Sequence, residues 1–164
     1  MSHDHPNHEH NQEGQVQLVT FKVGDIVLGI DIEHVQEINR LLDVTRVPGA
    51  SRMIHGVVNL RGEVVTVLDP HTIFDVRSSG TSDSRRNLVL RAGGERIGVM
   101  VDQVADILTI QRSELSPRPS NVRSVDRRFI DSVYLSDAGV IIILCADSLI
   151  NAIDQSPELA LAGA

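Results

Sequence analysis

Leu18-Val19-Thr20-Phe21-Lys22-Val23-Gly24 returns 69 residues later in the chain as Asn87-Leu88-Val89-Leu90-Arg91-Ala92-Gly93. In both copies a run of mainly apolar residues ends at a glycine, and the first copy continues into a second apolar run over residues 26–32. Two apolar runs joined by a short turn that contains glycine are typical of a β-hairpin. At the same offset Gly29 corresponds to Gly98. The sequence therefore predicts two copies of one hairpin.

A second hairpin is also repeated. Its first copy has apolar runs at residues 54–59 and 63–68, joined through Asn59-Leu60-Arg61-Gly62. At an offset of 76, residues 64–68 return as Val140-Ile141-Ile142-Ile143-Leu144. This later run has no polar alternation, so we expect it to be covered on both faces.

The two halves of the chain are too small to be stable alone, because a segment of about 70 residues buries too little apolar surface. We therefore predict a mostly β protein with two small β-barrels packed together, the first at about residues 17–76 and the second at about residues 87–153. Residues 77–87 contain no apolar side chain and are expected to link the two barrels.

Two short helices are predicted between the strands. Ile32, Val35 and Ile38 lie three residues apart, which is the spacing of a helical turn, and Asp31 precedes them as an N-cap. Asp69-Pro70 is expected to begin a second helix, with the aspartate as N-cap and the proline at the first helical position.

The composition excludes several classes of protein. The chain has 164 residues, a net charge of −7 and one cysteine, with three Phe, one Tyr and no Trp. So few aromatics cannot form a base-stacking platform, and the negative charge opposes phosphate binding, so we expect no nucleic-acid partner. A lone cysteine excludes a disulfide scaffold and fits an intracellular protein. No apolar stretch approaches the ~20 residues that span a bilayer, so we expect no direct membrane insertion. The 36 Val and Ile residues against 15 Leu favour sheet.

The two copies differ at the turn of the second hairpin. The first copy reads Gly56-Val57-Val58-Asn59-Leu60-Arg61-Gly62 and the second reads Ser132-Val133-Tyr134-Leu135-Ser136-Asp137-Ala138-Gly139, so only the first presents a long cation. Both cores need filling, whereas a functional site need occur only once, so this turn is a candidate site. The alternative is that Arg61 is a solvated turn residue and Gly62 only supplies a positive φ.

Four ordered motifs occur over residues 17–153. They are Phe21-Lys22-Val23-Gly24-Asp25 with Gly29-Ile30-Asp31-Ile32 and Val35-Gln36-Glu37-Ile38; the first-copy turn with Val67-Leu68-Asp69; Gly98-Val99-Met100-Val101-Asp102; and Ile110 followed by Pro117 and Pro119. Together they resemble the CheW family of chemotaxis adaptors. The resemblance implies that residues 15–153 are a CheW-like domain of two intertwined, five-stranded SH3-like β-barrels with short helices.

By this resemblance the chain is a non-enzymatic adaptor without a cofactor, which couples methyl-accepting chemoreceptors to a CheA-type histidine kinase in chemotaxis. Its partners would be the cytoplasmic tip of the receptors and the regulatory domain of the kinase, in the cytoplasm at receptor arrays. A pathway that controls pilus motility or second-messenger synthesis is an alternative output. The sequence has no Gly-rich phosphate loop, nucleophile elbow or His/Glu metal motif that would favour an enzyme.

The resemblance implies a receptor-binding groove between the barrels. The residues assigned to it are Val35, Glu37, Gly56, Asn59, Leu60 and Arg61. A receptor tip is a helical hairpin, so its binding requires apolar surface and a few charges at the rim. We hypothesise that Arg61 and Glu37 pair and so position the guanidinium.

The candidates for kinase contact are residues 140–144 and the edges around residues 99–101. The alternative is that these residues are ordinary core.

The histidines support a competing interpretation. Residues 1–14 are expected to be a disordered His-rich tail and residues 154–164 a flexible C-terminal tail. Closely spaced imidazoles bind Zn²⁺ or Ni²⁺, so His3, His5, His8 and His10 could make the chain a small metal-binding β-barrel; a mobile, solvated tail is the alternative. The spacing of His34, His55 and His71 does not predict that they converge.

Overall fold

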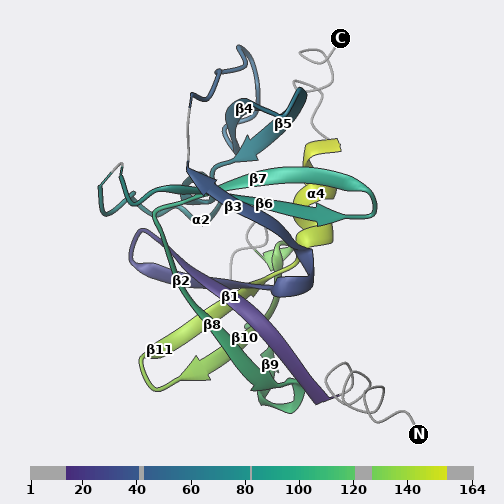
Figure 1. Cartoon of the computed structure of the whole chain (residues 1–164). Coiled ribbons are helices and arrows are strands. Elements are labelled where there is room, and N and C mark those ends of the chain that lie inside the picture. Colours follow the sequence, from purple (N-terminus) through teal and green to yellow (C-terminus); the bar gives the residue numbers. More distant parts are fainter. Residues whose placement is uncertain (1–13, 41–42, 82, 121–126, 155–164) are drawn as a thin grey trace, which may run out of the picture.

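The structure, a computed structural model, describes residues 14–40, 43–81, 83–120 and 127–154. In this part of the chain two twisted β-sheets lie one above the other (Figure 1). One has six strands in the order β8-β1-β2-β11-β10-β9, and the other has five in the order β3-β6-β7-β5-β4. These sheets are the two intertwined SH3-like barrels of a mostly β protein.

The elements follow the predicted order closely. The strands are β1 (Gln15–Val23), β2 (Ile26–Asp31), β3 (Val35–Arg40), β4 (Ile54–Leu60), β5 (Glu63–Leu68), β6 (Arg86–Ala92), β7 (Glu95–Val101), β8 (Gln103–Gln111), β9 (Leu115–Pro117), β10 (Ile130–Ser136) and β11 (Gly139–Leu144). The helices are α2 (Pro70–Phe74) and α4 (Ala146–Asp154), with the 3₁₀ helices η1 (Ile32–His34) and η2 (Arg112–Glu114).

The repeat in the sequence is a repeat in the structure. β1 pairs with β2 so that Phe21 lies opposite Leu28, and 69 residues later β6 pairs with β7 so that Leu90 lies opposite Ile97. The glycines that end the two repeated runs have the same positive φ of 60°. The prediction of two copies of one hairpin is confirmed.

The division into a first barrel at residues 17–76 and a second at residues 87–153 is wrong as a description of the sheets. β1 and β2 of the first half lie in one sheet with β8 to β11, whereas β3, β4 and β5 lie in one sheet with β6 and β7. Two parallel pairings join the halves, β2 with β11 and β5 with β7. They occupy strand edges that the hairpins alone would leave unpaired. The short strand β9 makes the first sheet six-stranded instead of five-stranded.

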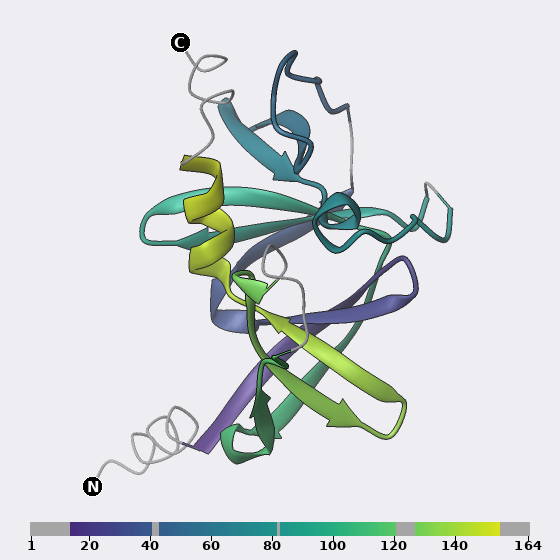
Figure 2. The same ribbon diagram turned by 180° about the vertical axis from the view of Figure 1, so that it is seen from behind.

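One core is shared by the two sheets. Phe21 and Leu28 of the six-stranded sheet are fully buried in the same cluster as Leu88 and Val99 of the five-stranded sheet. Helix α4 contributes Leu149 to this cluster and lies beside β6 and β7 at the back of the molecule (Figure 2). This main cluster thus joins the two sheets, and a smaller cluster lies within each sheet.

The predicted helical turn over residues 31–38 is only partly correct. Asp31 accepts a hydrogen bond of 3.0 Å from the backbone N–H of Glu33 and caps η1, but this helix ends at His34. The next residues form β3, in which Ile38 lies opposite Leu88 of β6. Sheet pairing outweighs the helical spacing here, because β-branched side chains suit a half-buried strand.

The predicted start of the second helix is confirmed. The Asp69 carboxylate accepts a hydrogen bond of 3.0 Å from the backbone N–H of His71, and Pro70 occupies the first turn of α2. The helix ends at Asp75, whose φ of 55° is left-handed.

Some predictions fall on residues that the structure does not describe. These are most of the two predicted tails, at residues 1–13 and 155–164, with His3, His5, His8 and His10. No helix in the described ranges is long and apolar enough to cross a membrane.

Candidate functional site: a charged turn between two strand edges

The turn between β4 and β5 presents Arg61 at the tip of a tight hairpin. Arg61 and Gly62 have φ values of 52° and 87°, so both lie in the left-handed region. This is the backbone that a two-residue hairpin turn needs to match the twist of its strands. The side chain of Asn59 fixes the turn by accepting a hydrogen bond of 2.9 Å from the backbone N–H of Gly62.

Arg61 and Glu37 form the predicted ion pair. Arg61 Nη1 lies 2.6 Å from Glu37 Oε2, and the arginine side chain is 76% exposed against 21% for the glutamate. Asn39 donates a hydrogen bond of 2.7 Å to the other carboxylate oxygen of Glu37. The hydrogen bond from Arg61 lowers the pKa of Glu37, so the carboxylate is charged at neutral pH. The site therefore offers an exposed guanidinium that is held by a fixed carboxylate.

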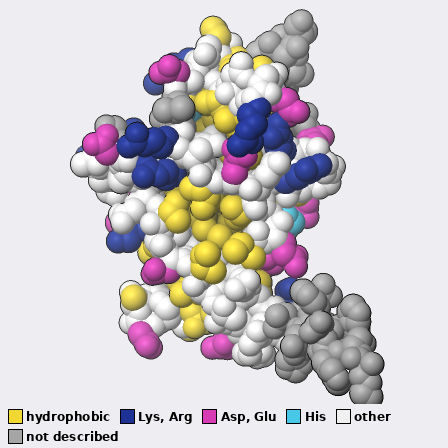
Figure 3. Space-filling model, in the orientation of Figure 1, with side chains coloured by type: hydrophobic (Ala, Val, Ile, Leu, Met, Phe, Trp, Pro, Cys, Tyr) yellow, Lys and Arg dark blue, Asp and Glu magenta, His cyan; other side chains and the backbone are white. Residues whose placement is uncertain are grey.

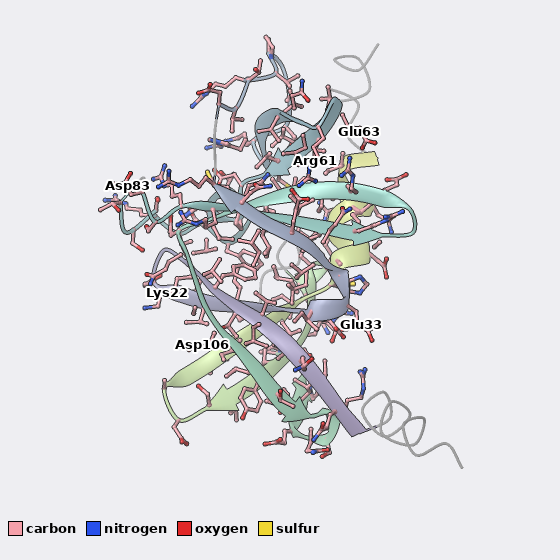
Figure 4. All side chains as sticks on the ribbon, in the orientation of Figure 1. Lys22, Glu33, Arg61, Glu63, Asp83 and Asp106 are labelled. Carbon is pink, nitrogen blue, oxygen red and sulfur yellow. The ribbon has the colours of Figure 1, made fainter. Side chains whose placement is uncertain are left out.

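The ion pair connects the two edges of the five-stranded sheet. Glu37 lies on the edge strand β3, and Arg61 follows the opposite edge strand β4. A second ion pair lies nearby, between Arg96 of β7 and Glu63 of β5, and Figure 4 shows Arg61 and Glu63 at the same end of the sheet. The charge of Arg96 also acts on Glu37. These contacts place several long charged side chains together at this end of the five-stranded sheet.

Gly56 has a packing role in the structure. A Cβ at this position would lie 2.5 Å from the carbonyl oxygen of Thr45 and 2.5 Å from Cγ1 of Val44. Thr45 exchanges backbone hydrogen bonds with Val57 at this point, which brings the segment after β3 against β4. Gly56 is therefore buried beneath this segment, and it shapes the hairpin that carries Arg61.

The remaining predicted site residues lie on the same two strands. Val35 begins β3 and packs against the main core, while Leu60 packs against the small cluster of Val58 and Val65 within the five-stranded sheet. Both are half-buried. The structure thus pairs Glu37 with Arg61 on a turn that Asn59 fixes, and the apolar side chains of Val35 and Leu60 lie on the same two strands.

Two exposed apolar residues that the sequence interpretation missed lie on edge strands of the two sheets. Ile38 of β3 is 42% exposed and Ile107 of β8 is 59% exposed, although both are large and apolar. In Figure 3 hydrophobic side chains form a patch between β3 and β1, next to a band of charged side chains. β3 and β8 are sheet edges, where a β-branched residue on the core-facing side is left partly uncovered. The face therefore combines an apolar patch with charges beside it.

A second candidate surface lies at the far end of the six-stranded sheet. A groove of about 1020 Å³ runs between β1, β8 and the β10–β11 hairpin. Leu135 and Val140 of that hairpin are 66% and 53% exposed. The charged residues that line the groove are Lys22, Asp25, Asp106, Glu114 and Asp137. By contrast, Val99 and Val101 are buried, so that part of the predicted kinase surface is core.

The described residues contain no group of three or more His, Cys, Asp or Glu side chains that could hold a metal ion. His34 lies 3.2 Å from the carbonyl oxygen of Arg91, and His71 is buried between two aspartates. The four histidines of the predicted tail, His3, His5, His8 and His10, lie outside the described residues.

Comparison with known proteins shows which proteins share this sequence pattern and fold. Residues 17–154 match the model of the CheW-like domain family. The chain is 27% identical over 134 residues to the chemotaxis protein CheW of Treponema pallidum, with 79% of each chain covered. It is 28% identical over 141 residues to the chemotaxis protein CheW of Rhizobium meliloti, covering 86% of this chain and 91% of that protein. The crystal structure of the scaffolding protein TtCheW from Thermoanaerobacter tengcongensis superposes with a TM-score of 0.74 at 27% identity, covering 80% of this chain and 84% of that one.

Proposed function

Because the chain belongs to the CheW-like domain family, we propose that it is a chemotaxis adaptor that couples chemoreceptors to a CheA-type histidine kinase without catalysing a reaction. The observation that carries this proposal is the match of residues 17–154 to the family, together with the shared fold of a CheW scaffolding protein. The adaptor acts in the cytoplasm, at receptor arrays, where it holds the regulatory domain of the kinase near the receptor tips.

The receptor tip binds at the face that carries Glu37 and Arg61. A helical hairpin needs apolar contacts for one face of a helix and polar contacts at its margins. The exposed Ile38 and Ile107 supply apolar surface, and the exposed Arg61 guanidinium supplies a cation that can form bidentate hydrogen bonds. Glu37 holds this guanidinium in place, which reduces the entropy lost when a receptor carboxylate binds it.

The remaining predicted site residues support Arg61. Asn59 fixes the turn through its hydrogen bond to Gly62. Gly56 lets the segment around Thr45 pack against β4. Val35 and Leu60 contribute apolar surface beside the ion pair, and their half-buried side chains restrict the position of the two strands. This set of residues thus acts as one receptor-binding unit.

The kinase regulatory domain binds at the β10–β11 end of the six-stranded sheet. The predicted kinase strand, β11, begins there with the exposed Val140, and Leu135 lies opposite it in the hairpin. The adjoining groove has an apolar floor and four carboxylates against one lysine. Such a surface suits a partner segment with apolar and basic side chains.

The test measures the two contacts separately. The full chain is mixed with membranes that carry the receptors, or with the purified kinase, and binding is measured by co-sedimentation and by pull-down. Arg61→Ala should weaken receptor binding about tenfold or more and leave kinase binding unchanged, since truncating a central arginine usually has a large effect. Val140→Asp should do the reverse, because it places a charge on an apolar contact.

Each variant is the control for the other, because both are exposed hairpin residues on different sheets. Glu37→Ala should weaken receptor binding as Arg61→Ala does, since the carboxylate positions the guanidinium. If the wild-type chain binds neither partner, the adaptor function is wrong. If both variants bind receptor and kinase as the wild type does, the assignment of the two surfaces is wrong.

A further inference from the structure

Asp102 is a buried carboxylate at the point where the chain passes from one sheet to the other. It is 1% exposed and is the single residue between β7 of the five-stranded sheet and β8 of the six-stranded sheet. Its counterpart in the first half, Glu33, is exposed and lies in η1. A buried ionised carboxylate needs hydrogen-bond donors around it, so its surroundings show what holds the junction together.

Three donors reach Asp102 from two other segments. The backbone N–H of Gly24, in the β1–β2 turn, lies 2.7 Å from Oδ2, and that of Ser79 lies 3.1 Å from the same oxygen. The Ser78 hydroxyl donates to Oδ1 at 2.6 Å. Residues 77–81, which were expected to be only a linker, are thus fastened to the junction, and Ser79 also donates to the carbonyl oxygen of Gly24 at 2.9 Å.

His71 of α2 completes the cluster. Its Nε2 lies 2.8 Å from Asp102 Oδ2 and its Nδ1 lies 2.7 Å from Asp69 Oδ1, and its side chain is 8% exposed. An ionised carboxylate only accepts hydrogen bonds, so a ring held between two carboxylates must donate from both nitrogens. Only the imidazolium form has two N–H groups. The geometry therefore requires a charged His71.

We propose that Asp69, His71 and Asp102 form a charged clasp that fixes the two sheets relative to each other, and that the clasp weakens when His71 loses its proton. The clasp joins helix α2, which follows the five-stranded sheet, to the β1–β2 turn of the six-stranded sheet through one carboxylate. His71 is thus a positioning residue for the face that lies across the two sheets. Its effect on receptor binding rests on the proposed function, whereas its effect on the fold does not.

The charges around His71 favour its protonated form. Burial opposes the charge, but the hydrogen bonds that His71 donates to Asp69 and Asp102 outweigh it and raise the pKa of His71. Arg85 also faces the cluster, with its Nε 3.8 Å from Asp102 Oδ1, and competes for this carboxylate. His55 lies near enough for its charge to interact with His71, but burial lowers the pKa of His55 and so favours its neutral form. Two carboxylates thus favour the charged form of His71, and one guanidinium opposes it.

The sign of the pH dependence follows from this arrangement. A histidine whose pKa is raised by folding stabilises the fold fully below its unfolded pKa of about 6.5, and this contribution is lost as the pH rises through the folded pKa. Between these two pKa values the unfolding equilibrium constant should rise by up to about tenfold for each pH unit.

The experiment measures urea unfolding of the full chain from pH 6 to pH 9 for the wild type, His71→Gln and His71→Arg. At each pH the free energy of unfolding of His71→Gln is subtracted from that of the wild type, so that the contributions of all other titrating groups cancel. We expect this difference in free energy to shrink as the pH rises. His71→Arg, which keeps a cation that does not titrate, should retain more of the stability at pH 9 than His71→Gln does. Parallel profiles for the wild type and His71→Gln would overturn the proposal.

Two further readouts separate a clasp from a simple packing role. Ring ¹⁵N chemical shifts of the wild type should show both His71 nitrogens protonated at pH 7, and a neutral ring at this pH would overturn the proposal even if no variant folds.

Receptor co-sedimentation is the second readout. Binding of the wild type to receptors should weaken between pH 7 and pH 9 more than binding of His71→Arg does. If the wild type binds no receptor at any pH, the adaptor function fails, while the unfolding profiles still decide the clasp.

Discussion

Arg61 is held in a backbone conformation that an arginine does not favour. Its φ of 52° places it in the left-handed region, where a side chain with a Cβ costs about 1–2 kcal/mol. Asn59 and Gly62 stabilise the turn locally, but neither removes this cost. A strained residue whose exposed side chain is fixed by an ion pair supports the proposal that the side chain contacts a partner.

Replacing Arg61 by glycine and by alanine should separate strain from function. Both changes remove the guanidinium, so both should weaken receptor binding about tenfold or more. Only glycine adopts a positive φ without cost, so Arg61→Gly should be more stable to urea than Arg61→Ala by about 1 kcal/mol. Equal stability of the two variants would contradict the strained turn, and retained receptor binding would contradict the role of the side chain.

The two charged clusters differ in how well the sequence predicts them. The Glu37–Arg61 pair could be predicted, because a long cation occurs in one copy of the repeat and a matching acid lies in a family motif. Asp102 and His71 could not, because the repeat matches Asp102 with Glu33 and gives no sign that the two carboxylates differ in burial. Burial distinguishes them: Asp102 is buried and Glu33 is exposed. Burial of a single carboxylate depends on contacts between distant segments.

At the scale of elements, local patterns were reliable where a turn or a cap determines the structure. The β4–β5 hairpin and the cap of α2 agree with the sequence pattern. The segment that begins β3 does not, because its conformation depends on pairing with β6, about 50 residues later in the chain. The same holds for Gly56, where the close approach of Thr45 comes from a segment between two strands.

Gly56→Ala should therefore destabilise the β4–β5 hairpin. A Cβ placed 2.5 Å from a backbone oxygen forces the segment at Thr45 away from β4, and we expect a loss of about 1–3 kcal/mol in the free energy of unfolding. Gly29→Ala is the matched control, since it also lies within a strand but the nearest neighbours of its Cβ would be side-chain methyl groups of Ile143 and Ile141, at 3.2 and 3.3 Å, with the nearest backbone oxygen, that of Val19, at 3.7 Å. Urea unfolding of both variants tests this, and an equal loss would contradict it.

At the scale of the whole molecule, the repeat predicts two similar β units but not how they are joined. The offset shows which strands resemble each other, whereas the pairing partners are set by the crossing of the chain after β2 and after β7. Because each sheet contains strands of both halves and the two barrels share the main core cluster, they are expected to unfold together. The junction at Asp102 is thus central to the stability of the chain.

The stability of the chain should fall in acid in a way that depends on Asp102. Burial disfavours the ionised carboxylate, but hydrogen bonds from Ser78, Gly24 and His71 outweigh it and lower the pKa of Asp102 from 3.8 to about 2. A carboxylate with a lowered folded pKa stabilises the fold above its unfolded pKa, and this stability is lost as the pH falls through the folded value. Between about pH 4 and pH 2 the loss should be about 1–2 kcal/mol.

Asp102→Asn is the comparison for this prediction. Its free energy of unfolding should be lower than that of the wild type at pH 6. The difference between these two free energies should narrow as the pH is lowered to 2. Urea or thermal unfolding at fixed ionic strength measures it. A difference that stays constant over this range would show that the Asp102 charge does not contribute to folding.

The most direct test of the adaptor function is the autophosphorylation rate of the CheA-type kinase in the presence of receptor-bearing membranes, with and without this chain. We predict that the wild-type chain changes the rate only when receptors are present, and that Arg61→Ala, at the same concentration and folded to the same extent, does not. A rate that is the same with and without the wild-type chain would contradict the proposal that this protein couples receptors to the kinase.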